Sequence, residues 1–198
     1  MRSPSDTLTA RLRATEDTRK KVEQLVSAGH MTELDAERVY EGLFMRAITT
    51  LEAFFEELFY LVVLGESAHT KSQAVPRADF RSRAVLSQFV LAERDYVEWI
   101  PYKAVERRAM VYLRKGRPFT SLSDGQKSKI RQWHLTRNAI AHPGRFARDQ
   151  FRSKVIAGLS LLPREQTPAG FLRSELQPNL RRFESILREM RRVGADLS

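Results

Sequence analysis

The longest regular pattern in the chain is an apolar stripe between residues 40 and 62. Its members recur at steps of three and four residues: Tyr40, Leu43, Phe44, Ala47, Ile48, Leu51, Phe54, Phe55, Leu58, Phe59 and Val62. This spacing places them on one face of an α-helix, with most of the intervening charged residues on the other face. An aromatic stripe of this kind is typical of the core helix of a bundle. We therefore predict one long, buried helix that starts near Thr32.

Helical periodicity also continues on both sides of this segment. It predicts helices over residues 6–28, 78–97, 101–115, 123–142, 145–157 and 179–194, with an irregular connection over 158–179 that leaves room for one short turn. Ser123 followed by Gln126 has the pattern of a capping box, and Pro143-Gly144 ends the helix that it starts. Residues 65–77 have the composition of a loop, and no segment alternates like a strand of convincing length. We expect an all-α protein, with residues 1–198 forming a single helical bundle of five to seven helices.

The last predicted helix, over residues 179–194, is amphipathic. Its apolar face contains Leu180, Phe183, Ile186, Leu187, Met190 and Val193. Its arginines, which we expect to face outward, are Arg181, Arg182, Arg188, Arg191 and Arg192. This pattern predicts that the helix closes the bundle with one apolar face.

Composition excludes several kinds of chemistry. The 198 residues include no cysteine, which rules out a disulfide scaffold, thiol catalysis and Cys-based zinc or iron–sulfur sites. No segment approaches the roughly 20 apolar residues of a membrane span, and the N-terminus has no apolar core like that of a signal peptide. We expect a cytoplasmic protein that does not bind a membrane and uses no metal and no cofactor.

The formal net charge of +10 is concentrated in the second half of the chain. Residues 1–99 contain 13 Lys and Arg against 16 Asp and Glu, whereas residues 100–198 contain 21 against 8, so the net charges are −3 and +13. Such an asymmetry indicates a polyanionic partner, nucleic acid or an anionic membrane surface. A solvated basic face without a partner is the alternative interpretation.

The helix predicted over residues 123–142 carries an unusual combination of polar groups. On a helical wheel with Ile130 at 0°, Trp133, Ile140 and Ala141 define an apolar face, and Arg137 falls in the middle of it. An arginine in that position is costly unless it is paired or lies at an interface. Asn138 and His142 lie four residues apart on one flank of the same helix. A snorkelling arginine, a surface amide and a histidine that complements the helix dipole are the structural alternatives.

Together, these three side chains suit the cleavage of an RNA phosphodiester. Histidine can take or give a proton near neutral pH, which the 2′-hydroxyl and the departing 5′-oxygen require. A guanidinium can hold phosphate oxygens and stabilise the charge of the transition state, and an amide can orient either partner. One copy of the chain supplies one histidine to this cluster, so a symmetric dimer would supply both an acid and a base.

The segment Arg137-Asn138-Ala139-Ile140-Ala141-His142 resembles the Arg-x4-His motif of the HEPN-domain family, including its frequent Asn after the Arg. Residues 50–59 are similar to the long aromatic helix of RiboL-PSP-type HEPN proteins, and residues 167–172 resemble the link before their last helix. The resemblance covers residues 32–194, and residues 1–30 then form an additional N-terminal helix. Only the six-residue motif is specific.

The resemblance implies a metal-independent endoribonuclease that acts as a homodimer, with both motifs meeting in a cleft at the interface. Many relatives are toxins with a partner antitoxin, or effectors of antiphage defence. Arg137 and His142 would be the catalytic pair and Asn138 the supporting polar residue. Glu52 or Thr50 could assist from the long helix. The chain departs from one subgroup at Gly144, where toxins modified on tyrosine carry that residue.

Further residues near the motif are candidates for secondary roles. His134 lies at about +40° on the wheel and could reach the same cleft, although a packed or surface histidine is the alternative. Arg131, Arg145 and Arg148 are predicted to contact RNA. Two competing functions stay open: a catalytically silent HEPN-like module that binds RNA or a protein, and a basic adaptor that contacts a membrane or a larger complex.

Overall fold

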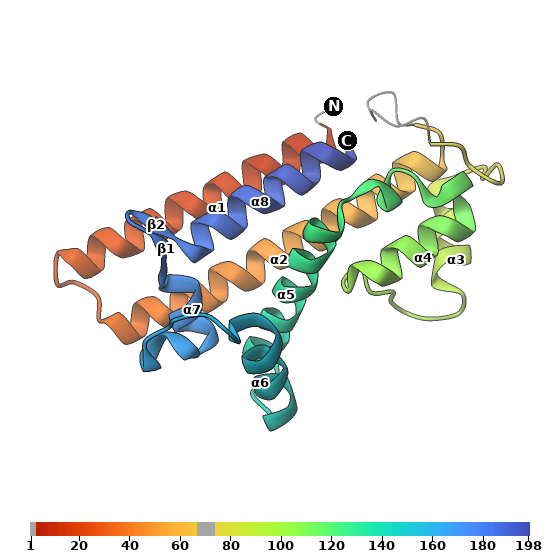
Figure 1. Cartoon of the computed structure of the whole chain (residues 1–198). Helices are drawn as coiled ribbons and strands as arrows, with labels where there is room; N and C mark the ends of the chain where they lie inside the picture. Colours follow the sequence, from red (N-terminus) through yellow and green to blue (C-terminus); the bar gives the residue numbers. More distant parts are fainter. Residues whose placement is uncertain (1–2, 67–73) are drawn as a thin grey trace.

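The computed structural model describes residues 3–66 and 74–198, in which eight α-helices are joined by short turns and one small hairpin (Figure 1). The helices are α1 (Pro4–Ser27), α2 (Glu33–Val63), α3 (Arg83–Leu91), α4 (Tyr102–Tyr112), α5 (Asp124–Ala141), α6 (Arg145–Phe151), α7 (Pro168–Arg173) and α8 (Arg182–Leu197). The turns are 3-10 segments at Arg114–Gly116, Phe119–Ser121 and Pro163–Gln166 and a π-turn at Arg152–Ile156, and the strands are β1 (Glu175–Gln177) and β2 (Leu180–Arg181). The predicted all-α fold is confirmed.

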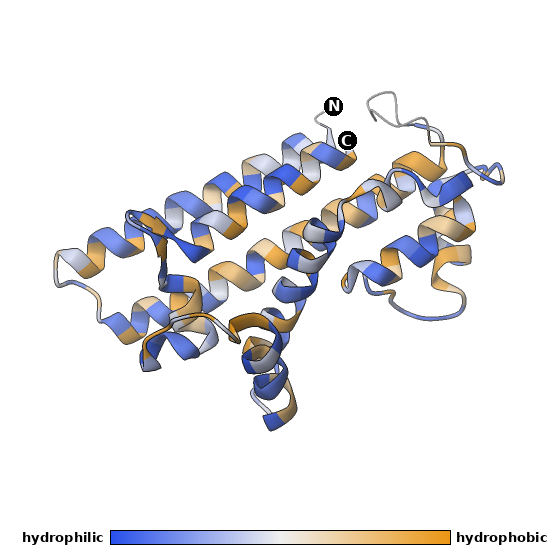
Figure 2. Ribbon diagram, viewed as in Figure 1, coloured by the Kyte–Doolittle hydropathy of each residue, from blue (hydrophilic) through white to orange (hydrophobic). Residues whose placement is uncertain are grey.

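Helix α2 is the central element, and the other helices pack along it. The Thr32 hydroxyl caps its first turn by accepting a hydrogen bond from the Asp35 backbone nitrogen at 3.1 Å. Every residue of the predicted stripe is buried, as are Ala36, Tyr60 and Val63 on neighbouring faces. Figure 2 shows apolar residues concentrated along α2, whereas the outward faces of α1 and α8 are hydrophilic. This distribution is expected of a helix covered by neighbours on several sides.

Helices α1 and α8 lie side by side and cover one face of α2 (Figure 1). They are in tight contact at Gly194, where an added Cβ would lie 2.5 Å from Cδ2 of the buried Leu8. A larger residue at this position would therefore force the Leu8 side chain to move. At one end of α2, helices α3 and α4 form a second packed group (Figure 1). No helix in the described residues is long and apolar enough to cross a membrane.

Several boundaries differ from the sequence prediction. Helix α3 ends at Leu91 rather than near residue 97, because Ala92 and Glu93 adopt left-handed backbone angles, with φ of 47° and 67°. Helix α7 and strand β1 form inside the segment predicted to be irregular, and β2 delays the last helix until Arg182. Residues 67–73 of the predicted loop lie outside the described residues.

The arginines of the last helical segment do not all face outward as predicted. Arg191 donates to Glu16 of α1 at 2.8 Å, and Arg181 donates to Glu23 of α1 at 2.7 Å. The Arg182 Nε donates to the Ser174 hydroxyl at 3.0 Å. These guanidiniums are part-buried because acidic or polar groups on neighbouring elements compensate their charge.

The Glu23 carboxylate ties four separate elements together. One oxygen accepts hydrogen bonds from the Tyr40 hydroxyl at 2.7 Å and the Arg173 Nε at 3.0 Å, and the other accepts from Arg181. Arg173 also pairs with Glu33 at the start of α2. Burial alone raises the pKa of Glu23, but the donors Arg173 and Tyr40 and the charges of Arg181 and Arg173 outweigh it and hold the pKa below its ordinary value.

We expect Glu23→Gln to lower the free energy of unfolding by about 2–4 kcal/mol, because the variant leaves the Arg173 and Arg181 charges part-buried and poorly compensated. Since the folded pKa is depressed, the Glu23 contribution is present above the ordinary carboxylate pKa and is lost as pH falls through the folded pKa. Urea denaturation at several pH values measures both effects. Asp17→Asn, at an exposed ion pair on the same helix, is the control and should change stability by less than about 1 kcal/mol. An equal effect of the two substitutions would contradict the assigned role of Glu23.

Candidate active site

Helix α5 carries the motif, and local interactions set both of its ends. The predicted capping box is present: the Ser123 hydroxyl accepts from the Gln126 backbone nitrogen at 3.3 Å, and the Gln126 side chain accepts from the Ser123 nitrogen at 3.0 Å. At the other end His142 is the C-cap residue, with its backbone nitrogen bonded to the Asn138 carbonyl at 2.8 Å. Pro143 then turns the chain out of the helix.

The buried face of α5 differs from the one that the helical wheel predicted. Its buried residues are Ile130, Trp133, Thr136 and Ala139, each three positions after the previous one. Each step of three residues along an α-helix corresponds to a rotation of −60° around its axis. The row of buried residues therefore winds around α5. Figure 1 shows the reason: α5 crosses α2 at a steep angle, so its two ends meet different neighbours. Arg137 therefore lies half-buried beside the core and not at the centre of an apolar face.

Three polar side chains of α5 form a hydrogen-bonded chain. The Arg137 Nη1 donates to the Asn138 Oδ1 at 3.1 Å, and the Asn138 Nδ2 lies 3.1 Å from the His134 Nε2. All three are half-buried. His134 and Asn138 are four residues apart, so they face each other on the helix surface. The structure thus brings His134, predicted only as a secondary candidate, into direct contact with the motif.

The order of donors in this chain determines the protonation of His134. A guanidinium has donors but no acceptor, so the group that Arg137 contacts must be the carbonyl oxygen of Asn138. The amide nitrogen of Asn138 then faces His134, and that nitrogen can only donate. The His134 Nε2 must therefore accept, which requires a neutral imidazole with its proton on Nδ1. Burial, followed by the nearby Arg137 charge, lowers the pKa of His134 and favours the same neutral form, while Glu98 opposes them.

The Arg137 guanidinium lies within a group of titratable side chains from two other segments. Burial raises the pKa of Glu52 on α2, and the charge of Glu98 raises it further, whereas Arg137 acts in the opposite direction. Burial and the carboxylates Glu52 and Glu98 likewise raise the pKa of Tyr96. Of the two α2 residues that were candidates, Glu52 is thus the one that lies in the electrostatic field of Arg137.

Glu98 and Tyr96 were not predicted as site residues. They lie on the connection over residues 92–101, the first part of which was predicted to be helical. Trp99 anchors this connection: its ring is buried, the Arg108 guanidinium lies 4.3 Å from the ring centroid, and Arg108 donates to the Glu98 carbonyl at 3.2 Å. No local pattern in the sequence indicates that this segment lies near α5.

The remaining predicted residues fall into two groups. His142, Arg131, Arg145 and Arg148 are exposed, and the His142 ring makes no hydrogen bond or ion pair with any described residue. Thr50 lies elsewhere, two residues from Glu52 and so on another face of α2. Its hydroxyl donates to the Arg46 carbonyl at 2.8 Å, and it lines a hollow of about 440 Å³ between α1 and α2. The structure therefore does not bring Thr50 to the motif.

Three hollows of the described structure lie away from the motif residues. Besides the hollow beside Thr50, one of about 370 Å³ adjoins α7 and one of about 260 Å³ adjoins the π-turn, and none of the three is lined by Arg137, Asn138 or His142. Within residues 3–66 and 74–198, no group of three or more His, Asp or Glu side chains is placed to hold a metal ion.

Comparison with protein-family models, with curated proteins and with solved structures found no match to this chain. The side chains themselves indicate which chemistry the site can support. At the end of α5 they offer a guanidinium whose free N–H groups can bind an oxyanion, an amide that orients it, and an imidazole open to solvent. Such groups can bind the oxygens of a phosphodiester and transfer a proton to or from it.

We expect nitrogen-detected NMR at pH 7 to find His134 neutral, with its proton on Nδ1. Asn138→Ala removes the donor that sets this tautomer, so the two tautomers should mix in the variant.

Because the pKa of His134 in the folded state lies below the ordinary value of about 6.5, the unfolded state binds this proton first as pH falls. Stability should therefore decrease from about pH 6.5 until folded His134 is itself protonated, and His134→Gln, which keeps an acceptor, should remove that part of the decrease. An Nε2-protonated ring in the unaltered protein would contradict the donor order.

Proposed function

We propose that this protein is a metal-independent endoribonuclease of the HEPN type that cleaves single-stranded RNA, with Arg137, Asn138 and His142 as its active-site residues. The observation that carries the proposal is the hydrogen-bonded pair of Arg137 and Asn138 in the last turns of α5, the helix whose C-cap residue is the exposed His142. A pre-oriented guanidinium in the last turns of the helix that ends at an exposed imidazole favours a catalytic role over a role in packing.

In the proposed reaction, the ring of one His142 takes the proton from the ribose 2′-hydroxyl. The 2′-oxygen attacks the adjacent phosphorus while the bond from phosphorus to the 5′-oxygen breaks. The departing 5′-oxygen receives a proton from a second imidazole, giving a 2′,3′-cyclic phosphate and a free 5′-hydroxyl. Arg137 holds the non-bridging oxygens, whose negative charge grows in the transition state, and Asn138 keeps its guanidinium in place.

The second imidazole comes from a second copy of the chain in this proposal. Each copy carries one His142, exposed and without a side-chain partner among the described residues, so one copy offers an acid or a base but not both. Two α5 ends meeting across a twofold axis would supply both groups and would enclose a motif that is open in a single copy. The exposed Arg131, Arg145 and Arg148 would then lead the RNA backbone to this interface.

The biological role that we propose is that of a cytoplasmic toxin or antiphage effector, controlled by an antitoxin or another partner protein. A catalytically silent helical module that binds RNA or protein is the second candidate. The exposed position of His142 also fits that candidate, since none of the three hollows described above is lined by it. Cleavage assays separate the two.

We expect the purified protein to cleave single-stranded RNA in the presence of EDTA and to leave 2′,3′-cyclic phosphate ends. His142→Ala removes the proton-transfer group and should lower the rate by about 10²–10⁴-fold. Arg137→Ala removes the oxyanion ligand and should lower it by about 10²–10³-fold. Gel analysis with end-group mapping measures both effects. His30→Ala, at an exposed histidine in the turn between α1 and α2, is the matched control and should retain full activity.

Two results would count against this proposal. Undiminished cleavage by His142→Ala would show that the activity belongs to another site or to a contaminant. RNA binding that weakens with salt, without cleavage by the unaltered protein, would favour the silent module.

We expect the protein to have a mass in solution of twice the 22.9 kDa of the chain, because the proposed site needs two copies. Light scattering coupled to size exclusion measures this mass over a range of protein concentrations. A protein that stays monomeric at the concentration where it cleaves RNA would rule out the composite site while leaving a single-chain mechanism open.

A further inference from the structure

Helix α6 stands out from the bundle directly after the motif, as Figure 1 shows. One side of it is anchored: Phe151 is buried, and its ring packs against Phe171 of α7 with centroids 5.7 Å apart. Phe146 lies five residues earlier, about 140° around the helix, and is 78% exposed. This is the largest exposed fraction among the large apolar side chains of the described residues.

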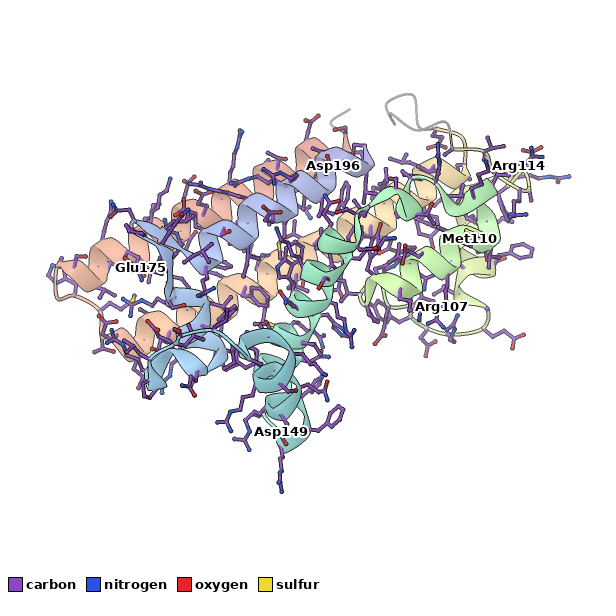
Figure 3. All side chains as sticks on the ribbon, in the orientation of Figure 1. Arg107, Met110, Arg114, Asp149, Glu175 and Asp196 are labelled. Carbon is purple, nitrogen blue, oxygen red and sulfur yellow. The ribbon has the colours of Figure 1, made fainter. Side chains whose placement is uncertain are left out.

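Residues 142–157, which contain α6 and are called the α6 arm below, are basic as a whole. Figure 3 marks Asp149, which is the one acidic residue between 142 and 157 and which pairs with Arg145 at 3.6 Å. Arg148, Arg152 and Lys154 are exposed and have no acidic partner among the described residues. Four cations against one anion give the arm a net charge of +3. Charge of this sign attracts phosphates and repels basic surfaces.

The surroundings of Phe146 indicate what the ring can bind. Residues three, four and seven positions further along the helix share its face, and these are Asp149, Gln150 and Ser153. The ring is therefore isolated among polar groups, whereas the core of a protein interface is continuous and apolar. Arg148, two positions after Phe146, lies about 160° away around the helix, and Arg152 and Lys154 follow in the π-turn, so a strand that stacks a base on the ring reaches these cations by passing around the segment. An exposed aromatic ring combined with cations in this way can stack a nucleobase and hold its phosphates.

We propose that Phe146 is a stacking platform for an unpaired base of single-stranded RNA, whose phosphates lie along Arg148, Arg152 and Lys154. The inference deepens the proposed ribonuclease function and rests on it for the identity of the strand. A strand held on this arm passes the end of α5, because only Pro143, Gly144 and Arg145 separate His142 from Phe146. The sequence alone predicted that Arg148 binds RNA. The roles of Phe146, Arg152 and Lys154 are inferred from their exposure in the structure.

The chain allows a direct optical test. Both natural tryptophans, Trp99 and Trp133, are at most 4% exposed, so RNA has little access to them. Phe146→Trp adds an exposed indole at the proposed platform. Phe89→Trp is the matched control, because Phe89 is also an exposed phenylalanine, 61% accessible, and lies on α3. The probe is a single-stranded 2′-O-methyl oligouridylate of 12 nucleotides, which lacks the attacking hydroxyl and is not cleaved.

We expect the oligouridylate to quench the emission of Phe146→Trp but not that of Phe89→Trp. In anisotropy titrations of the labelled oligonucleotide, Phe146→Ala should weaken binding by about 5- to 100-fold. The triple variant Arg148→Gln, Arg152→Gln, Lys154→Gln should reduce the slope of log affinity against log salt by about 2. Inorganic polyphosphate, which has charge but no bases, should bind without quenching.

Three results would overturn the inference. The first is binding of the oligouridylate that leaves the Phe146→Trp emission unchanged. The second is equal quenching of Phe89→Trp. The third is emission that depends on protein concentration without RNA, together with dissociation of a dimer by Phe146→Ala, which would make the arm an interface between copies. The probe is not cleavable, so base stacking and RNA cleavage are measured independently. Quenching by a protein that cuts no RNA would refute the ribonuclease proposal and support the stacking platform. Cleavage of RNA without quenching of the probe complex would refute the stacking platform alone.

Discussion

The burial of α2 is the constraint on which the rest of the structure depends. A helix of 31 residues with apolar side chains on most of its surface cannot remain in water, and covering it requires neighbours on several sides. The α1–α8 pair, the α3–α4 group, α5 and α7 each cover part of it. The steep crossing of α5 over α2 follows from this arrangement and leaves the C-terminal end of α5, with Arg137 and His142, at the surface. The position of the motif is therefore a result of core packing.

The basic charge of the second half of the chain has two physical roles. Arg173, Arg181 and Arg191 are part-buried and compensated by Glu23 and Glu16, so they hold α1, α7, β2 and α8 together. Their charges are largely cancelled at short range and contribute little to attraction at a distance. Among the exposed cations of the α6 arm, Arg148, Arg152 and Lys154 have no such compensation from the described residues. A count of charges along the sequence gives both groups equal weight, whereas only the second is free to meet a polyanion.

His134, Asn138 and Arg137 form a row of hydrogen-bonded, half-buried side chains on α5. Each member constrains the next, because the guanidinium can only donate and so sets the orientation of the amide, which in turn sets the tautomer of the ring. Half-burial strengthens these hydrogen bonds relative to the same bonds in water. The result is a guanidinium held beside Glu52 and Glu98 before any substrate is present, while His142 stays unconstrained at the helix end. We propose that a second copy of the chain completes this arrangement.

The sequence by itself determined the all-α class, the long core helix and its caps, because apolar period and capping residues are local signals that survive without a tertiary context. It also placed Asn138 and His142 on one flank of a helix that carries Arg137, since residues four positions apart share a helical face. Only the tertiary structure decided which residues surround them. Glu98 and Tyr96 reach the motif through a connection whose path depends on left-handed angles at Ala92 and Glu93 and on the buried Trp99. Thr50 was separated from it because the two sides of α2 meet different partners, and Phe146 was exposed because α6 is anchored by Phe151 on its other side. The local sequence pattern does not distinguish these helix faces, so long-range packing decides which of them are buried and which are exposed.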